Sequence, residues 1–319
     1  MSKVAVIIPC FRVKKHVIDV IARVPAMVDR IYVVDDACPE KSGEHVKAQV
    51  RDPRVHVIFL EKNQGVGGAM VAGYQRAIDD GYDVAVKVDG DGQMNPALVP
   101  RFVEPILEGR ADYTKGNRFY RLSSLKKMPS TRLFGNSLLS FWTKLVTGYW
   151  QTMDPTNGYT AIHTAILKEL SLSRIEKRYF FETDMLFQLG YFRAAVVDIP
   201  MEAVYADEQS SLRIMTVLRT FPPKYLVRLF QRVFYEYFVR EFNVATVELV
   251  AGMGLISFGL IYGVQHWIRA YLTQTQTAIG VVMAAALPTI VGFQMLIAFI
   301  NYDVGHIPRS AVWKLLGKS

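Results

Sequence analysis

Cysteine is scarce in this chain of 319 residues, which contains only Cys10 and Cys38. The two are too few for a disulfide framework, and no Cys-x-x-Cys pair or cluster of cysteine and histidine provides the spacing of a zinc site. The histidines, His163 among them, show no spacing typical of metal ligands either. We therefore expect two free, buried thiols and structural roles for the histidines.

Charged side chains are missing from two stretches near the C-terminus, residues 249–268 and 276–302. Each stretch is long enough to cross the roughly 30 Å hydrocarbon core of a bilayer as a helix. They explain why hydrophobic residues make up 51% of the chain and why its mean hydropathy is +0.16. The sequence predicts a hairpin of two transmembrane helices within residues 244–302.

Basic residues gather on both sides of this hairpin. Positively charged flanks are retained on the cytoplasmic side of a membrane. We therefore expect a multi-pass protein of the inner (cytoplasmic) membrane, with residues 303–319 as a cytoplasmic tail and both termini in the cytoplasm. The basic residues are Arg213, Arg219, Lys224, Arg228, Arg232 and Arg240 before the hairpin, and Arg309, Lys314 and Lys318 after it.

Much of the net charge of +8 lies in residues 212–243, where basic residues alternate with apolar and aromatic ones at helical spacing. This pattern is typical of amphipathic helices at a membrane surface. Pro222-Pro223 predicts a break between two such helices. Anionic lipid headgroups explain the basic charge better than nucleic acid does, so we expect no nucleic-acid partner.

Residues 1–211 alternate between strand-like and helix-like patterns. Such alternation predicts an α/β fold with a doubly wound, mostly parallel sheet, in which ligands bind at the carboxyl ends of the strands. The predicted strands are Val4–Ile8, Ile31–Val34, Val55–Leu60 and Val84–Val88, and the helices between them are Lys15–Val24, Gly43–Val50 and Gly65–Asp80.

The end of the fourth predicted strand has the pattern Asp89-Gly90-Asp91-Gly92-Gln93. Alternate residues of an extended chain share a face, so Asp89 and Asp91 converge and Gln93 can join them. Such hard oxygen ligands suit Mg²⁺ or Mn²⁺, with open positions for substrate phosphates. An acidic, glycine-rich turn is the alternative interpretation. The ends of the other three strands are also polar: Pro9-Cys10-Phe11, Asp35-Asp36 and Asn63-Gln64-Gly65.

A nucleotide-cofactor motif is not evident. No P-loop is present, and Gly65-Val66-Gly67-Gly68 is half of a dinucleotide-binding fingerprint that follows the third strand instead of the first. The glycines instead indicate a helix N-terminus that approaches either phosphates or the sheet closely.

Taken in order, these motifs resemble those of family 2 glycosyltransferases with the GT-A fold, and most of all the dolichol- and polyprenyl-phosphate sugar synthases with a C-terminal membrane anchor. Two departures are Arg12-Val13-Lys14, where Asn and Glu are usual, and Gly90, where Ala is commonest. The matching segments are Val6–Phe11, Val33–Asp36, Asn63–Ala69, Asp89–Gln93, Lys115–Arg118, Asp154–Tyr159 and Glu182–Asp184.

The resemblance implies a nucleoside-diphosphate sugar as donor and Mg²⁺ or Mn²⁺ as cofactor. Asp91 and Gln93 would hold the ion, and Asp89 would complete its shell or contact the ribose. Asp36 would accept hydrogen bonds from the base or ribose, or else close its strand through an Asx turn. The implied donor-binding residues are Pro9, Phe11, Asp36, Asn63, Gly65, Asp89 and Gly90.

The acceptor is open between polyprenyl phosphate (undecaprenyl or dolichyl) and a hydroxyl of a lipid-linked glycan or diacylglycerol. A phosphate is largely ionised near neutral pH and needs cations, whereas a hydroxyl needs a general base. Asp184 is the candidate base or orienting carboxylate, although its position also suits a helix cap. The implied catalytic residues are Asp89, Asp91, Asp184 and Arg118, and the candidates for an acceptor phosphate are Arg118, Arg132, Arg213 and Ser211.

The leading hypothesis is an inverting, metal-dependent glycosyltransferase that acts on polyprenyl phosphate at the cytoplasmic membrane face, in the synthesis of cell-envelope glycans. A non-catalytic, membrane-anchored assembly protein that retains the fold is the alternative from another class, and the intact motif residues argue against it. We also expect a homo-oligomer, because several glycines of the hairpin permit close helix contact. These are Gly252, Gly254, Gly259 and Gly263.

Overall fold

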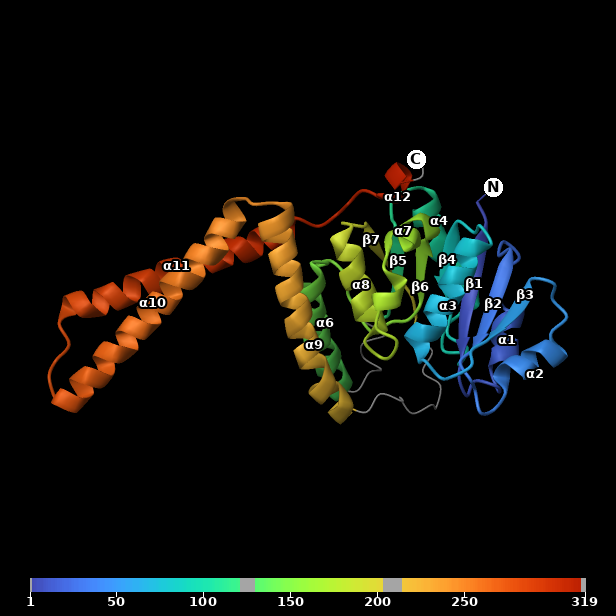
Figure 1. The fold of residues 1–319 in the computed structure, drawn as a ribbon, viewed down its shortest axis with the longest axis horizontal. Coiled ribbons are helices and arrows are strands. Elements are labelled where there is room, and N and C mark those ends of the chain that lie inside the picture. Colours follow the sequence, from blue (N-terminus) through green and yellow to red (C-terminus); the bar gives the residue numbers. More distant parts are fainter. Residues whose placement is uncertain (1, 121–129, 203–213, 317–319) are drawn as a thin grey trace. The chain divides into compact units, whose positions relative to one another are not determined.

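The computed structural model describes the backbone of residues 2–120, 130–202 and 214–316, together with their side chains apart from those of residues 130–133 and 214–218. The chain divides into two compact units (Figure 1). One consists of Met1–Arg228 with Pro308–Ser319, and the other of Leu229–Ile307. A segment from the end of the chain is thus part of the first unit.

A seven-stranded mixed sheet forms the centre of the first unit, with the strand order β3-β2-β1-β4-β6-β5-β7. Its pairs are parallel except those of β6, which runs antiparallel to β4 and β5. The predicted mostly parallel sheet is therefore confirmed. The strands are β1 Val4–Cys10, β2 Arg30–Asp35, β3 Val55–Phe59, β4 Val84–Lys87, β5 Tyr113–Asn117, β6 Thr160–His163 and β7 Val196–Pro200.

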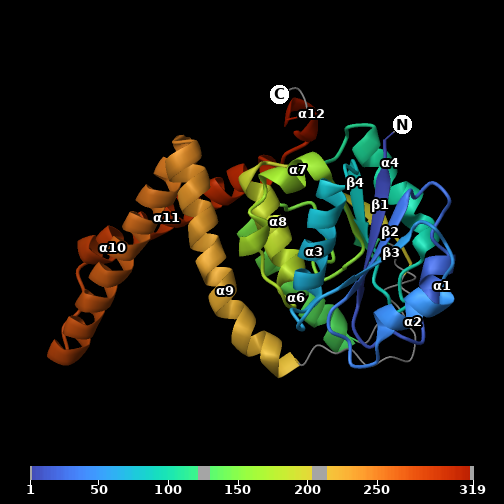
Figure 2. The same ribbon diagram turned by 45° about the vertical axis from the view of Figure 1, so that its right-hand side comes forward.

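Helices cover both faces of this sheet, so each face has its own hydrophobic core (Figure 2). Val6 and Ile8 of β1 pack with α1, α2 and α4, whereas Ala5 and Ile7 pack on the other face with α3, α7 and α8. Successive side chains of a strand point to opposite faces, which explains why β1 is apolar throughout. The helices are α1 Val17–Ala22, α2 Ser42–Gln49, α3 Val66–Asp79, α4 Val99–Leu107, α7 Thr164–Glu169 and α8 Phe181–Tyr191.

Two further helices, α6 (Ser130–Thr147) and α9 (Ile214–Phe234), contribute side chains to the wall of the candidate site. The predicted break at Pro222-Pro223 is wrong, because α9 continues through both prolines. Proline removes a backbone N–H from the helix, but Phe221 and Tyr225 are buried beside Phe180, and the Tyr225 hydroxyl lies 2.9 Å from Thr143 Oγ1. This packing keeps the helix intact.

The second unit contains the two predicted apolar helices, α10 (Val244–Thr273) and α11 (Ile279–Gly305), both long and apolar enough to cross a membrane. Glycines bring them together: a Cβ on Gly259 would lie 2.2 Å from Thr289 Oγ1, and a Cβ on Gly292 would lie 2.7 Å from Gly252 O. Gly252 and Gly259, which the sequence suggested for contact between copies, therefore pack within the hairpin.

A π-helix, Tyr235–Arg240, precedes α10 and is tied to the end of α11. The Tyr237 hydroxyl donates to Asp303 Oδ1 at 2.6 Å, and Arg232 forms an ion pair with the same carboxylate. Asn243 caps α10 and donates to the Tyr302 hydroxyl at 2.9 Å. Polar contacts thus close the hairpin at the end where its two helices join the rest of the chain.

Candidate active site

A pocket of about 410 Å³ opens at the carboxyl ends of β1, β2 and β4. Parallel pairing brings these ends side by side, since Cys10 pairs with Asp35 and Ile7 with Lys87. The pocket wall contains every residue for which the sequence predicted donor contact. These are Pro9, Phe11, Asp36, Asn63, Gly65, Asp89 and Gly90, and Asp91 joins them.

Lys87, the last residue of β4, holds two carboxylates beside the pocket. Its Nζ lies 2.9 Å from Asp89 Oδ1 and 3.2 Å from Glu182 Oε1, and its side chain is buried. Burial alone favours the neutral amine, but the two carboxylates raise the pKa of Lys87 above its usual value. Burial also raises the pKa of Glu182, against the effect of Lys87. The pocket wall therefore combines one ammonium group with several carboxylates.

Gly158 lets another part of the chain approach this ion-pair cluster. A Cβ at this position would lie 2.2 Å from Lys87 Nζ and 2.8 Å from Asp89 Oδ2. Contacts of this length are not tolerated, so only glycine fits here without displacing the charged groups. The sequence showed Gly158 only as part of a family motif, because its partners are about 70 residues away in the chain.

Two of the three predicted metal ligands lie together in the pocket wall. Asp89 and Asp91 both line the pocket, and Asp91 Oδ1 accepts a hydrogen bond from Gln93 N at 2.9 Å. Gln93 does not itself line the pocket. No group of three or more His, Cys, Asp or Glu residues that could hold a metal ion occurs in the described parts of the chain. Two carboxylates fit an ion such as Mg²⁺, which usually retains water or binds substrate phosphates as its remaining ligands.

Asp36 fastens two strand ends together at the pocket. Its carboxylate accepts hydrogen bonds from the backbone N–H groups of Gln64 (2.7 Å) and Gly65 (2.8 Å), and Asn63 Nδ2 donates to the Asp36 carbonyl. Asp36 thus closes the loop after β3 onto β2, instead of forming the local Asx turn that the sequence offered as an alternative. The neighbouring Asp35 is likewise bound to the N–H groups of Cys38 and Gly43.

The glycines at the start of α3 accommodate protein backbone. Gly67 N and Gly68 N donate to the carbonyl of Lys177, at 2.9 and 3.3 Å. A Cβ on Gly67 would lie 2.4 Å from Glu176 O, and one on Gly65 would lie 2.6 Å from Lys177 O. The predicted close approach is confirmed, but its partner differs. The glycines contact the backbone of the segment before α8, whereas the sequence suggested phosphates or the sheet.

Glu182 faces the pocket, whereas Asp184 does not. Two residues apart on α8, they are separated by about 200° around the helix axis. Asp184 is fully buried, accepts a hydrogen bond from Glu176 N at 2.9 Å and forms a 2.9 Å ion pair with Arg228. Burial raises the pKa of Asp184. The predicted base therefore lies outside the pocket, and the carboxylate inside it is Glu182, for which the sequence predicted no role.

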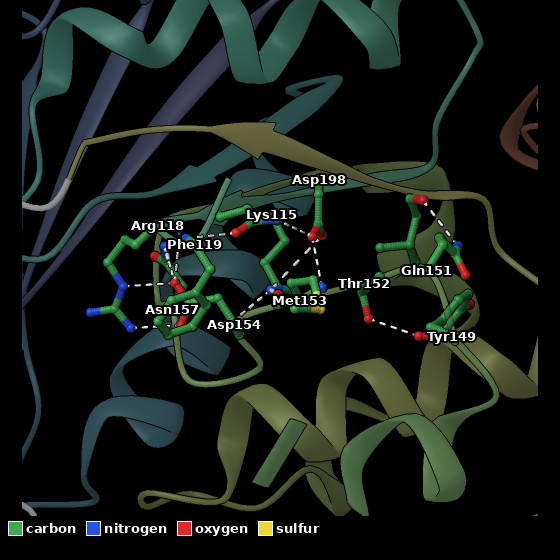
Figure 3. Close-up of polar contacts among 12 residues, drawn as sticks. Lys115, Arg118, Phe119, Tyr149, Gln151, Thr152, Met153, Asp154, Asn157 and Asp198 are labelled. Atoms are coloured by element: carbon green, nitrogen blue, oxygen red, sulfur yellow. Dashed lines mark hydrogen bonds and ion pairs between the residues drawn. The ribbon is translucent and has the colours of Figure 1, made fainter. Parts of the chain in front are cut away.

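Arg118 is held by a buried aspartate. Its Nε lies 2.7 Å from Asp154 Oδ2 and its Nη2 lies 2.7 Å from Oδ1, in a two-pronged arrangement (Figure 3). Asp154 is fully buried, whereas 18% of the Arg118 side chain is exposed. Arg118 is not part of the pocket wall. The other predicted phosphate ligands, the Arg132 side chain, Ser211 and Arg213, lie outside the described residues.

Four further residues of the pocket wall are apolar, aromatic or basic. They come from α6, from α9 and from the segment before α8, which are far from the strand ends in sequence. No local motif marks these residues, so the sequence did not predict them at the donor site. They are Leu139, Phe221, Arg178 and Tyr179.

Comparison with known proteins agrees with this arrangement. The model of the family described as "Glycosyl transferase family 2" matches residues 5–171, more than half of the chain. The undecaprenyl-phosphate mannosyltransferase of Micrococcus luteus is 32% identical over 176 residues, which cover 54% of this chain and 71% of that protein. The UDP-N-acetylglucosamine–dolichyl-phosphate N-acetylglucosaminyltransferase of Methanococcus voltae is 29% identical, covering 63% of this chain and 85% of that protein.

Among solved structures, glucosyl-3-phosphoglycerate synthase from Mycobacterium tuberculosis, in complex with Mn²⁺, UDP-glucose and phosphoglyceric acid, has a TM-score of 0.53. It is 19% identical, and the match covers 72% of this chain and 79% of that chain. This likeness shows the GT-A fold. The family match and the curated relatives show the activity class, which is glycosyl transfer. The chain belongs to glycosyl transferase family 2.

Proposed function

We propose that this chain transfers a sugar from a nucleoside-diphosphate sugar to polyprenyl phosphate at the cytoplasmic face of the membrane, with inversion and with Mg²⁺ or Mn²⁺. The observation that carries the proposal is the gathering of the donor-site residues around Asp89 and Asp91 in one pocket. The relatives described above are named for transfer to undecaprenyl or dolichyl phosphate, which supports the choice of acceptor.

Each part of the pocket has a role in binding the donor. Asp89 and Asp91 would hold the ion at the diphosphate, and Gln93 supports Asp91 through its backbone N–H. When bound, the ion offsets the negative charge that develops on the leaving nucleoside diphosphate. Phe11 and Asp36 lie in the wall where the base and ribose would bind. Mn²⁺ or Mg²⁺ accompanies UDP in crystals of the M. tuberculosis enzyme.

The acceptor side favours a phosphate over a hydroxyl. A hydroxyl acceptor needs a general base, and Asp184 is engaged by Arg228 and Glu176 N away from the pocket. Glu182, the carboxylate that does face the pocket, is paired with the buried ammonium group of Lys87. A phosphate is already an anion and needs cations and a place for its hydrocarbon chain. Attack on the anomeric carbon from the side opposite the diphosphate inverts its configuration. For such a ligand the pocket offers the cation Arg178 together with Leu139, Tyr179 and Phe221. Arg118, the phosphate ligand that the family resemblance implies, lies outside the pocket wall with 18% of its side chain exposed, and we assign it as a second cation for the acceptor phosphate.

The route of the chain supports the membrane topology. The chain leaves the first unit at Arg228 and returns to it at Pro308. If α10 and α11 both span the membrane, the hairpin enters and leaves on the side of the catalytic unit. The basic flanks support a cytoplasmic location for that side. The tail 303–319 would then be cytoplasmic, as would residues 1–211.

The test is transfer by the purified full-length protein in detergent or lipid nanodiscs, with a panel of nucleoside-diphosphate sugars and a short polyprenyl phosphate. We expect an acid-labile product in which one phosphate joins sugar and lipid. The control is the corresponding polyprenol, which has a hydroxyl where the phosphate stood. Product formed with the polyprenol, a glycan or diacylglycerol but not with the phosphate would overturn the proposal.

A further inference from the structure

Asp154 has an unusual combination of burial, backbone conformation and charge. It is fully buried, and its φ is +56°, in the left-handed region that non-glycine residues seldom adopt. A neighbouring buried cation stabilises this conformation: Lys115 Nζ donates to the carbonyl of Asp154 at 2.6 Å and also to that of Met153. Burial lowers the pKa of Lys115. Such a costly arrangement persists only where the surrounding contacts determine it.

The segment that contains Asp154 is also fastened to two neighbouring strands (Figure 3). Asp198 of β7 accepts hydrogen bonds from Met153 N at 2.8 Å and from Asn117 Nδ2 of β5 at 3.0 Å. Asn157 N donates to the Asp154 carbonyl at 3.1 Å. The backbone of residues 153–157 is therefore held at several points, which fixes where the Asp154 carboxylate lies.

That carboxylate in turn fixes Arg118. It accepts hydrogen bonds from Arg118 N at 3.1 Å and, through both of its oxygens, from Nε and Nη2. A two-pronged pair sets the plane and direction of a guanidinium group, which a single contact does not. Burial alone would raise the pKa of Asp154, but the hydrogen bonds and charge of Arg118 lower it. The pair is thus charged, and its geometry is set by the buried partner.

The same segment reaches the donor pocket within a few residues. Thr156 lines the pocket, and Gly158 packs against Lys87 and Asp89 so closely that it has no room for a Cβ. Arg118 is therefore connected to the donor end of the site through a rigid segment of the chain. A shift of Asp154 would move Arg118 relative to the pocket.

We propose that Asp154 is a positioning residue for the acceptor phosphate, which acts by orienting the Arg118 guanidinium, with Lys115 and Asp198 holding the segment 153–157 in place. This inference rests on the proposed function, and it adds that Asp154 contributes through Arg118 and not by contact with substrate. It follows that a positive charge at position 118 is not sufficient to bind the acceptor phosphate, because the orientation of the guanidinium group also matters.

The test is a double-mutant cycle in the full-length protein with Asp154→Asn, Arg118→Ala and the double variant. Asparagine keeps the size of aspartate and tolerates the left-handed conformation. We expect kcat/KM for polyprenyl phosphate to fall about 100-fold in Arg118→Ala and about 10-fold in Asp154→Asn. The double variant should be no worse than Arg118→Ala, within about threefold, because Asp154 has no effect once Arg118 is absent.

Two further readouts distinguish positioning from a general structural effect. The affinity for the free nucleoside diphosphate, measured by calorimetry, should stay within about twofold of wild type in each variant, whereas a collapsed pocket would lose it. Arg118→Lys keeps the charge but lacks the fork, so we expect about a 10-fold loss of kcat/KM without any change at Asp154. This variant keeps the proposal testable if Asp154→Asn fails to fold.

Two outcomes would overturn the inference. One is a double variant whose loss is the product of the two single losses, since Asp154 would then act independently of Arg118. The other is an Arg118→Lys variant with wild-type kcat/KM, since orientation would then be irrelevant. Wild-type protein that uses only hydroxyl acceptors would instead refute the proposed function itself, so the two failures are distinguishable.

Discussion

Buried or half-buried carboxylates lie at two opposite edges of the catalytic sheet, one formed by the carboxyl ends of its parallel strands (the pocket edge) and the other by their amino ends. The surroundings of these carboxylates differ. At the pocket edge, Asp89 and Glu182 share a single ammonium group, that of Lys87. At the other edge, Asp112 lies just before β5, is fully buried, and has its charge dispersed over backbone N–H groups. Its donors, at 2.7 to 2.9 Å, are Ala195, Val312 and Trp313.

The difference separates a structural carboxylate from one proposed to bind a ligand. Asp112 is satisfied within the protein, and it fastens the C-terminal segment 308–316 to the first unit. Carboxylates that outnumber their cations beside a cavity instead leave negative charge for a ligand to neutralise. Mutation of Asp112 should therefore reduce stability and leave catalysis intact. Mutation of a pocket carboxylate should reduce catalysis and leave stability nearly unchanged.

The largest effect is expected at the pocket edge. Asp91→Ala should lower the transfer rate about 1000-fold, because a ligand of the ion that stabilises the leaving diphosphate is lost. The melting temperature should change little. Initial rates at increasing Mn²⁺ or Mg²⁺, and after chelation of the ion, provide the measurement. A variant that retained about a tenth of the wild-type rate would contradict the assigned role.

The opposite edge should show the reverse behaviour. Asp112→Ala leaves three N–H groups, one buried and two part-buried, without their acceptor, so we expect the free energy of unfolding to fall by about 3 kcal/mol. The rate per folded molecule should remain within about twofold of wild type. Urea denaturation followed by tryptophan fluorescence measures the first quantity. Asp52→Ala is the control, because the Asp52–Arg54 pair is partly exposed and should contribute at most about 1 kcal/mol.

The edge with Asp112 should also be sensitive to acid through His163, whose ring stacks on Trp313 with centroids 4.1 Å apart. Burial lowers the pKa of His163 from 6.5 to about 4. Above pH 6.5 the residue is neutral in both states and stability is complete. Between pH 6.5 and 4 the unfolded chain binds a proton that the folded protein does not, so the free energy of unfolding falls by up to about 1.4 kcal/mol per pH unit.

The matched variant is His163→Asn. His163 Nδ1 accepts a hydrogen bond from Ala165 N and so caps α7. Asparagine supplies the same kind of acceptor without titrating. Melting temperatures between pH 7 and about 4.5 should therefore fall less steeply in the variant than in wild type. Identical slopes for the two proteins would contradict a titrating role for His163.

A smaller effect at the pocket edge would test its close packing. Gly158→Ala should lower kcat/KM by about 10- to 100-fold, since the added methyl group would displace Lys87 or Asp89. Gly135→Ala in α6 is the control, because nothing lies within 4 Å of its Cβ position and alanine favours the helix. Equal activity of both variants would show that the Lys87–Asp89 geometry tolerates displacement.

The gathering of the proposed donor-site residues in one pocket was predictable because these residues lie directly after strands. Once the alternating pattern predicts a parallel sheet, the carboxyl ends of its strands must meet, whatever path the connecting loops take. Asp36, Asp89 and Asp91 could therefore be assigned to one place without knowledge of distant contacts. The boundaries of the elements in residues 4–88 were also predicted to within one or two residues.

The proposed acceptor end depends on pairs that no local pattern reveals. Asp154 lies 36 residues from Arg118, and its left-handed conformation is held by Lys115. The opposite orientations of Glu182 and Asp184 follow from the start of α8 at Phe181. A carboxylate-rich motif therefore predicted the right segment but the wrong residue for the pocket.

The sequence by itself determined the alternating sheet, the strand-end carboxylates and the apolar hairpin, because these follow from short-range periodicity and composition. It also indicated the family, through the resemblance of its ordered motifs. The tertiary structure decided which carboxylates face the pocket, which cation each one meets, and that α9 continues through two prolines. It also decided that the C-terminal segment returns to the catalytic unit. The physical reason is that burial and ion pairing depend on groups brought together by the whole fold, whereas the period of a strand or helix depends on its own residues.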